Sequence, residues 1–163
     1  NKAIEQNKRF YKVITEETYS TLMYKKLSAM YDEYVSKLSD DEKKKPENSK
    51  ESFDRAIKTL LSPWFRFFIK YDPRPMIEQV TVPVLALNGE KDLQVSPFQN
   101  LPEIEKALKA GGNKNFKTVE LPGLNHLFQP AKTGGVSEYG NIETTFSEDA
   151  LRIMKDWILE VTK

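Results

Sequence analysis

The fold class of this chain is decided by one stretch, PVLALNGEKD at residues 83–92. Four consecutive apolar residues, Val84–Leu87, lie between Pro83 and the turn pair Asn88-Gly89. A short apolar run bounded by turn residues is typical of a strand that is buried on both faces of a parallel sheet. The stretch therefore predicts an α/β protein whose first polar loop, ending at Asp92, directly follows that strand.

A helix and a second strand follow this first strand. An apolar stripe predicts a helix from about residue 100 to 110, with Pro102 in its first turn and Gly111-Gly112 at its end. Residues 116–121 predict the second strand, which Pro122-Gly123 closes. A strand, a helix and a strand in this order predict two parallel strands with flanking helices.

The end of the chain is expected to be a loop and then a helix. Residues 129–146 show little periodicity and predict a loop. The last helix begins at Ser147, with acidic residues in its first turn. We expect it to turn four residues inward: Leu151, Met154, Ile158 and Val161. Two strands make too small a sheet to stand alone, so the chain is either the end of a larger α/β protein or assembles with itself.

The first third of the chain is predicted to be helical. Apolar residues recur at helical spacing over 18–38 and again over 53–61. Between these helices, Ser39 and Glu42 have the spacing of a capping box. The aromatic block Trp64–Phe68 could line an acyl pocket, although aromatics at helical spacing more often pack in a core.

Composition excludes several classes of site and partner. The chain has no cysteine, which excludes disulfides and cysteine metal sites, and a single histidine cannot make a multi-histidine zinc site. Lys and Arg outnumber Asp and Glu by only 25 to 24, so no net charge favours nucleic acid or an anionic membrane. No run approaches about 18 apolar residues, and we therefore expect no membrane-spanning helix. No cofactor motif is present, so no cofactor is expected.

Two residues at the ends of the predicted strands could carry chemistry together. Asp92 follows the first strand, His126 follows the second, and open α/β sheets place their ligands at this edge. A histidine is a useful general base when an acid holds its other nitrogen. Taken singly, Asp92 could be a turn residue and His126 a hydrogen-bonded surface residue. Glu90 competes with Asp92 for the acid role, and position alone does not separate the two.

A nucleophile to complete such a pair is missing from the sequence. No serine has the Gly-x-Ser-x-Gly setting of a nucleophile elbow. The nearest stretch is Gly135-Val136-Ser137, but it lacks the second glycine and follows His126, which is the wrong order along the chain.

Two motifs resemble segments of the α/β-hydrolase family. Residues 83–92 resemble its seventh strand, in which the final Asp is the triad acid, and LPGLNHLF at residues 121–128 resembles the segment that carries the catalytic His. Residues 147–161 match the last helix of the family, and the likeness covers residues 75–163. The first 65 residues lie where the family inserts a helical lid. The resemblance thus implies a helical lid or cap region at 1–72 and the C-terminal part of the hydrolase core at 73–163.

The same resemblance implies a function. Asp92 and His126 become the triad acid and base of a serine hydrolase that cleaves carboxylic esters or related acyl bonds of a small molecule. The nucleophile, the oxyanion hole and the other strands lie outside the chain, so the fold is an incomplete α/β-hydrolase fold. The chain starts at Asn1 without an initiator Met, and we expect an excerpt or a processed product. Related hydrolases are often exported, which is an analogy and leaves the compartment open.

Two readings from other classes stay open beside this one. The chain could be a non-catalytic α/β-hydrolase-like binding module. It could also be a helical scaffold whose Asp92 and His126 are incidental, which a buried strand at 84–87 would contradict.

Overall fold

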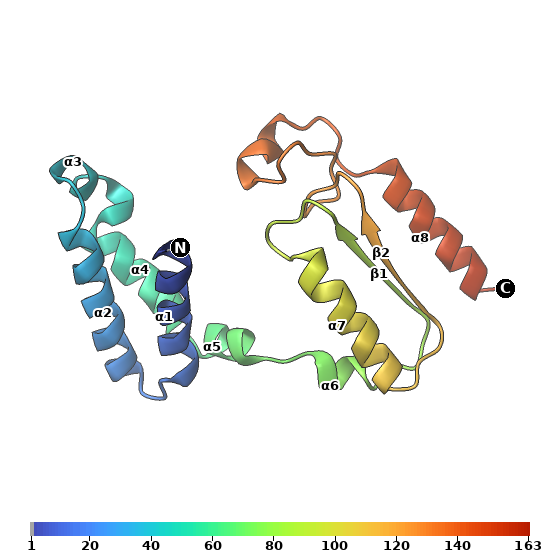
Figure 1. Cartoon of the computed structure of the whole chain (residues 1–163), viewed down its shortest axis with the longest axis horizontal. Coiled ribbons are helices and arrows are strands. Elements are labelled where there is room, and N and C mark those ends of the chain that lie inside the picture. Colours follow the sequence, from blue (N-terminus) through green and yellow to red (C-terminus); the bar gives the residue numbers. More distant parts are fainter. Residues whose placement is uncertain (1) are drawn as a thin grey trace. The chain divides into compact units, whose positions relative to one another are not determined.

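The strand expected at residues 84–87 is formed, and it continues for two more residues, but Val84–Leu87 are half-buried and not buried on both faces as predicted. In the computed structural model, which describes residues 2–163, β1 (Val84–Gly89) and β2 (Phe116–Leu121) form a two-stranded parallel sheet (Figure 1). The register pairs Val84 with Phe116 and Gly89 with Leu121. The chain is therefore a mixed α/β protein, mostly helical, with helices flanking a small parallel sheet. The purely helical alternative is wrong.

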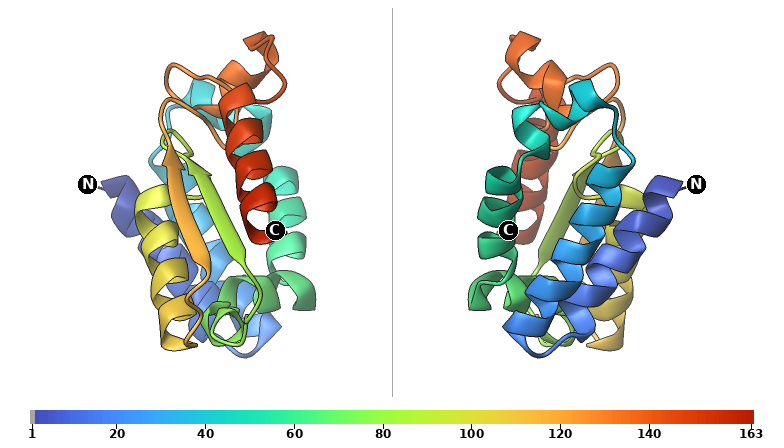
Figure 2. Two further views of the ribbon diagram at one scale, coloured as in Figure 1. Left: turned by 90° about the vertical axis from the view of Figure 1, so that its right-hand side faces the viewer. Right: turned by 90° about the vertical axis from the view of Figure 1, so that its left-hand side faces the viewer.

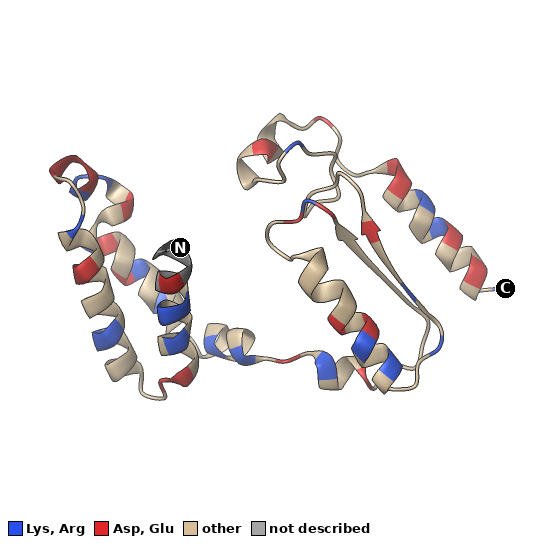
Figure 3. Cartoon of the chain, viewed as in Figure 1, with Lys and Arg blue, Asp and Glu red and all other residues tan. Residues whose placement is uncertain are grey.

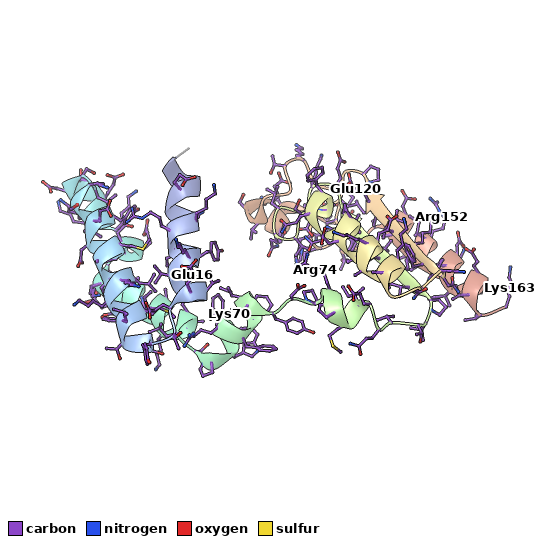
Figure 4. All side chains as sticks on the ribbon, turned by 60° about the horizontal axis from the view of Figure 1, so that its bottom comes forward. Glu16, Lys70, Arg74, Glu120, Arg152 and Lys163 are labelled. Carbon is purple, nitrogen blue, oxygen red and sulfur yellow. The ribbon has the colours of Figure 1, made fainter. Side chains whose placement is uncertain are left out.

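The chain divides into two compact units, Asn1–Tyr71 and Asp72–Lys163, called here the helical unit and the sheet unit. Their boundary lies between α5 (Pro63–Lys70) and α6 (Arg74–Ile77). Lys70 and Arg74, the residues that end and begin these helices, are labelled in Figure 4.

The helical unit is held by a small aliphatic core. Before α5 it contains α1 (Lys2–Glu16), α2 (Ser20–Ser36), α3 (Asp40–Lys43), the 3-10 helix η1 (Pro46–Asn48) and α4 (Lys50–Leu60). One buried cluster joins α1, α2 and α4, and it consists of Ile14, Met23, Leu27 and Ile57. The predicted capping box is confirmed, because Ser39 Oγ accepts from the N–H of Glu42 and the Glu42 carboxylate accepts from the N–H of Ser39.

The aromatic block on α5 does not pack in this core. Trp64, Phe67 and Phe68 are 68%, 63% and 61% exposed. The interpretation that these aromatics pack in a core is therefore wrong for them. The aliphatic side chains of the other helices already fill the core, and α5 adds Ile69 to it. The exposed rings pack on each other instead, with Trp64 and Phe68 stacked at a centroid distance of 5.4 Å.

The sheet unit places one long helix on each face of the sheet. α7 (Pro97–Ala110) covers one face and α8 (Glu148–Val161) the other, as Figures 1 and 2 show. The buried residues between β2 and α8 are Leu121, Leu124 and Ala150, and Leu87, Val119 and Ile153 pack against them.

Two boundaries in this unit differ from the sequence prediction. α7 begins at Pro97 and not near residue 100, because Pro97 occupies the first turn, where its missing N–H costs no hydrogen bond. Pro102 therefore lies inside the helix. The predicted loop 129–146 contains a short 3-10 helix, η2 (Val136–Asn141).

Two of the four residues of α8 that were predicted to turn inward are exposed. Leu151 and Ile158 are 52% and 56% exposed, whereas Ala150 is fully buried and Ile153 packs beside it. A sheet of two strands is narrower than the apolar stripe of this helix. The sheet therefore covers only the side of α8 that carries Ala150 and Ile153 and leaves Leu151 and Ile158 exposed.

β1 has one paired edge and one open edge. The N–H groups of Val84 and Glu90 donate to Asn115 and Leu121 on the β2 side, at 3.0 and 2.9 Å. Because successive residues of a parallel strand point their backbone groups to opposite sides, Leu85 and Leu87 present theirs to the open edge. Within residues 2–163 no third strand pairs there.

We predict that the isolated chain self-associates through the open edge of β1 or through the aromatic block on α5. Open strand edges and exposed apolar patches both recruit partners. Light scattering over a dilution series should show a dimer at about 100 μM, in the range where such surfaces drive association. Leu85→Pro removes an N–H from the open edge without touching the β2 pairing, and Trp64→Ala breaks the aromatic block. One of the two should restore the monomer. A wild-type chain that stays monomeric at this concentration contradicts the prediction.

Candidate active site

The parallel register brings two loops together at one edge of the sheet. β1 and β2 end opposite each other at Gly89 and Leu121, and the loops that follow are joined by backbone hydrogen bonds. The N–H of Glu90 donates to the carbonyl of Leu121, and that of Lys91 donates to Leu124, both at 2.9 Å. The loop after β1 is therefore fixed to the loop after β2.

This approach requires a glycine at the end of β1. A Cβ atom on Gly89 would collide with the carbonyl oxygens of Leu124 and Asn125. Both contacts are with backbone, which cannot rotate away. Gly89 thus lets the second loop approach closely enough for residues 34 positions apart to meet.

Asp92 and His126 form a hydrogen-bonded pair at this edge. The Nδ1 atom of His126 lies 2.9 Å from Oδ2 of Asp92. The carboxylate is buried, with 5% of its side chain exposed, whereas 36% of the imidazole is exposed. The acid is therefore enclosed by protein, and the base reaches solvent beside it.

Hydrogen bonds keep the buried carboxylate ionised. Its Oδ1 accepts from the backbone N–H groups of Gln94 and Val95 at 2.9 and 2.8 Å. Burial raises the pKa of Asp92, but the hydrogen bonds from Val95, His126 and Gln94 outweigh it and hold the pKa below its ordinary value of 3.8. Asp92 is thus a charged acceptor at neutral pH.

The charge on Asp92 fixes the tautomer of a neutral His126. An ionised carboxylate can only accept hydrogen bonds, so the proton of the pair must be on Nδ1. The Nε2 atom then has a free lone pair, which is the form that a general base needs.

Glu90, the competing acid, has a different partner. Its Oε2 accepts from the backbone N–H of Gly123 at 2.7 Å, so the side chain holds the start of the second loop. The structure therefore pairs His126 with Asp92 and not with Glu90.

Asn125 holds the loop that presents His126, and the sequence analysis missed it. Its side chain is fully buried, and its Oδ1 accepts from the N–H groups of Leu127 and Gln129 at 2.9 and 3.0 Å. Phe128, the next residue but one after His126, takes the left-handed conformation with a φ of 56°. An Asn within a Pro-Gly-rich turn is the sequence signal that could have indicated this role.

No serine hydrogen-bonds to the His126 ring, and no metal site is formed, in the described part of the chain. Asp92 is the one hydrogen-bond partner of the His126 ring there, and Ser137 lies in η2 without a hydrogen bond to it. No group of three potential ligands could hold a metal ion within residues 2–163.

A cavity of about 630 Å³ lies between α1 and α2 of the helical unit, whereas the pair lies in the sheet unit. None of the described helices is long and apolar enough to cross a bilayer.

Comparisons with known proteins return no match to a family model, a curated protein or a solved structure. The geometry of the site has to be interpreted by its own chemistry.

Gly89→Ala should destabilise the sheet unit by about 3 kcal/mol, because a side chain there collides with the backbone of the second loop. Gly140→Ala is the matched control, since a Cβ at Gly140 meets nothing within 4 Å. Urea unfolding followed by Trp157 fluorescence, in a Trp64→Phe background, measures both. Equal stabilities of the two variants would contradict the close approach.

Asp92→Asn should lower the stability of the sheet unit by about 1–3 kcal/mol at neutral pH, because the variant loses charge-assisted hydrogen bonds. The pKa of Asp92 is lower in the folded chain than its ordinary value of 3.8. Its stabilisation is therefore complete above that value and is lost as the pH falls through the folded-state pKa. The difference between wild type and variant should shrink below about pH 4, in the same urea assay. A difference that grows in acid would show that the carboxylate is protonated in the folded chain.

Proposed function

We propose that this chain is the C-terminal part of an α/β-hydrolase-type serine hydrolase that acts on carboxylic esters or related acyl compounds. The observation that carries the proposal is the 2.9 Å contact between Asp92 and His126 at the carboxyl edge of a parallel sheet. The motifs at residues 83–92 and 121–128, which resemble the acid and histidine segments of that family, support it.

In this proposal the chain supplies the acid and the base of a triad. A serine outside the chain attacks the acyl carbon, and Nε2 of His126 takes the hydroxyl proton as the new C–O bond forms. Asp92 accepts from Nδ1–H throughout, so the imidazolium that forms is stabilised by a buried negative charge. The imidazolium then gives its proton to the leaving group, which restores the neutral base.

The helical unit is proposed to be the lid of this enzyme, and the sheet unit the end of an incomplete hydrolase core. α7 and α8 then correspond to helices on the two faces of a larger sheet. The open edge of β1 would pair with a strand outside the chain. This assignment also accounts for the exposed side of α8, which a wider sheet would cover.

The proposed substrate is a small acyl molecule and not a nucleic acid. Residues of both signs occur along the helices of each unit (Figure 3), and Lys and Arg exceed Asp and Glu by only one over the chain, so no net charge favours a polyanion. Beside the pair, Glu90 and Lys91 are engaged by the backbone of Gly123 and Ala131.

The proposal predicts that the 163-residue chain alone is inactive. It should hydrolyse a chromogenic ester no faster than its His126→Ala variant, and a fluorophosphonate serine probe should not label it, because it lacks a nucleophile elbow. The chain extended by its upstream coding sequence should contain a Gly-x-Ser-x-Gly serine that the probe labels. In that protein His126→Ala should lower kcat by about 1,000-fold or more.

Two results would overturn this proposal. Labelling of the 163-residue chain itself would reveal a nucleophile within it. An extended chain that has no such serine and no hydrolase activity would support the alternative, a non-catalytic binding module.

A further inference from the structure

The carboxylate oxygen of Asp92 that bonds to His126 also accepts a hydrogen bond from a second side chain, that of Asn88. The Oδ2 atom that faces His126 also accepts from Nδ2 of Asn88, at 3.1 Å. Asn88 lies near the end of β1 and is buried, with 6% of its surface exposed. The acid of the site is thus held from three directions: by its own loop, by His126 and by the strand.

The same amide also fixes the turn that carries the acid. The second N–H of Asn88 Nδ2 donates to the carbonyl of Val95 at 2.9 Å. The N–H of that same Val95 donates to Oδ1 of Asp92. One asparagine therefore braces both the carboxylate and the turn whose backbone holds the carboxylate in place.

The chemistry favours a neutral double donor at this position. A leucine of similar size would fill the space but leave Oδ2 of Asp92 and the Val95 carbonyl without these donors. An aspartate would put a second carboxylate about 3 Å from the first, where two negative charges compete for one proton. Only an amide supplies two N–H groups without a charge.

We propose that Asn88 is the positioning residue of the acid–base pair: it aims Oδ2 of Asp92 at Nδ1 of His126 and so keeps the base in its Nδ1–H tautomer. Asn88 acts through Asp92 and does not touch the reacting atoms. The effect of Asn88 on turnover rests on the proposed function. Its effect on the tautomer does not, because the hydrogen bonds exist in this chain as it stands.

The single histidine makes a direct test possible. His126 is the only histidine of the chain, so its ring ¹⁵N signals are unambiguous in an NMR spectrum. At a pH at which the ring ¹⁵N shifts show a neutral imidazole, the wild-type chain should show the Nδ1–H tautomer with a proton that exchanges slowly with water.

Asn88→Leu should increase the exchange rate of the Nδ1 proton about five- to tenfold, as expected for the loss of one hydrogen bond from the network, and the two tautomers should become mixed. It should also raise the pKa of Asp92, observed through its ¹³Cγ signal, because a donor to the charged form is lost.

Asn113→Ala is the matched control for a merely structural effect. Asn113 is also a buried asparagine that donates to two carbonyls, those of Val80 and Val82, but it lies at the opposite end of the strands. Its replacement should lower the stability of the sheet unit and leave the His126 tautomer and the pKa of Asp92 unchanged.

The outcomes separate this inference from the proposed function. If Asn88→Leu, like Asn113→Ala, leaves the His126 tautomer and the pKa of Asp92 unchanged, the proposed role of Asn88 is wrong, whereas the acid–base pair is not contradicted. If the wild-type chain itself lacks the Nδ1–H tautomer, the pair is not formed in solution, and both proposals fail.

Discussion

The structure of the site depends on one constraint, the parallel register of β1 and β2. Because the two strands run the same way and end at Gly89 and Leu121, the polar loops that follow them must emerge side by side. The absence of a side chain at Gly89 then allows the second loop to come within contact of the first. Everything that makes Asp92 and His126 a pair follows from this meeting of two loops at one sheet edge.

Burial of a charged group is tolerated at this edge because the loops supply donors. Asp92 accepts from two backbone N–H groups, one amide and one imidazole. Removing a carboxylate from water is costly unless hydrogen bonds replace the lost solvent. The same donors that meet this cost also fix the direction of the carboxylate, so stability and orientation have one physical origin here.

A sheet of two strands leaves apolar surface uncovered. It is too narrow for the apolar stripe of α8, and Leu151 and Ile158 remain exposed. The open edge of β1 has the same cause. The aromatic rings of α5 are uncovered for a different reason, because the aliphatic core of the helical unit is complete without them. Uncovered strand edge and uncovered apolar surface both mark places where further protein would pack.

The local elements could be predicted from the sequence alone. Turn residues around Val84–Leu87, the capping box at Ser39 and the apolar stripe of α4 act over a few residues, and such short-range signals can be read from one chain. It also placed Asp92 and His126 at strand ends. Which acid faces the histidine could not be predicted, because Glu90 and Asp92 are only two positions apart in the same loop. Glu90 is held away from His126 by the N–H of Gly123, a residue 33 positions further along the chain, and only the folded chain brings these two groups together. The roles of Asn88 and Asn125 were hidden for the same reason: an asparagine near a turn has many possible partners, and the folded loops select them.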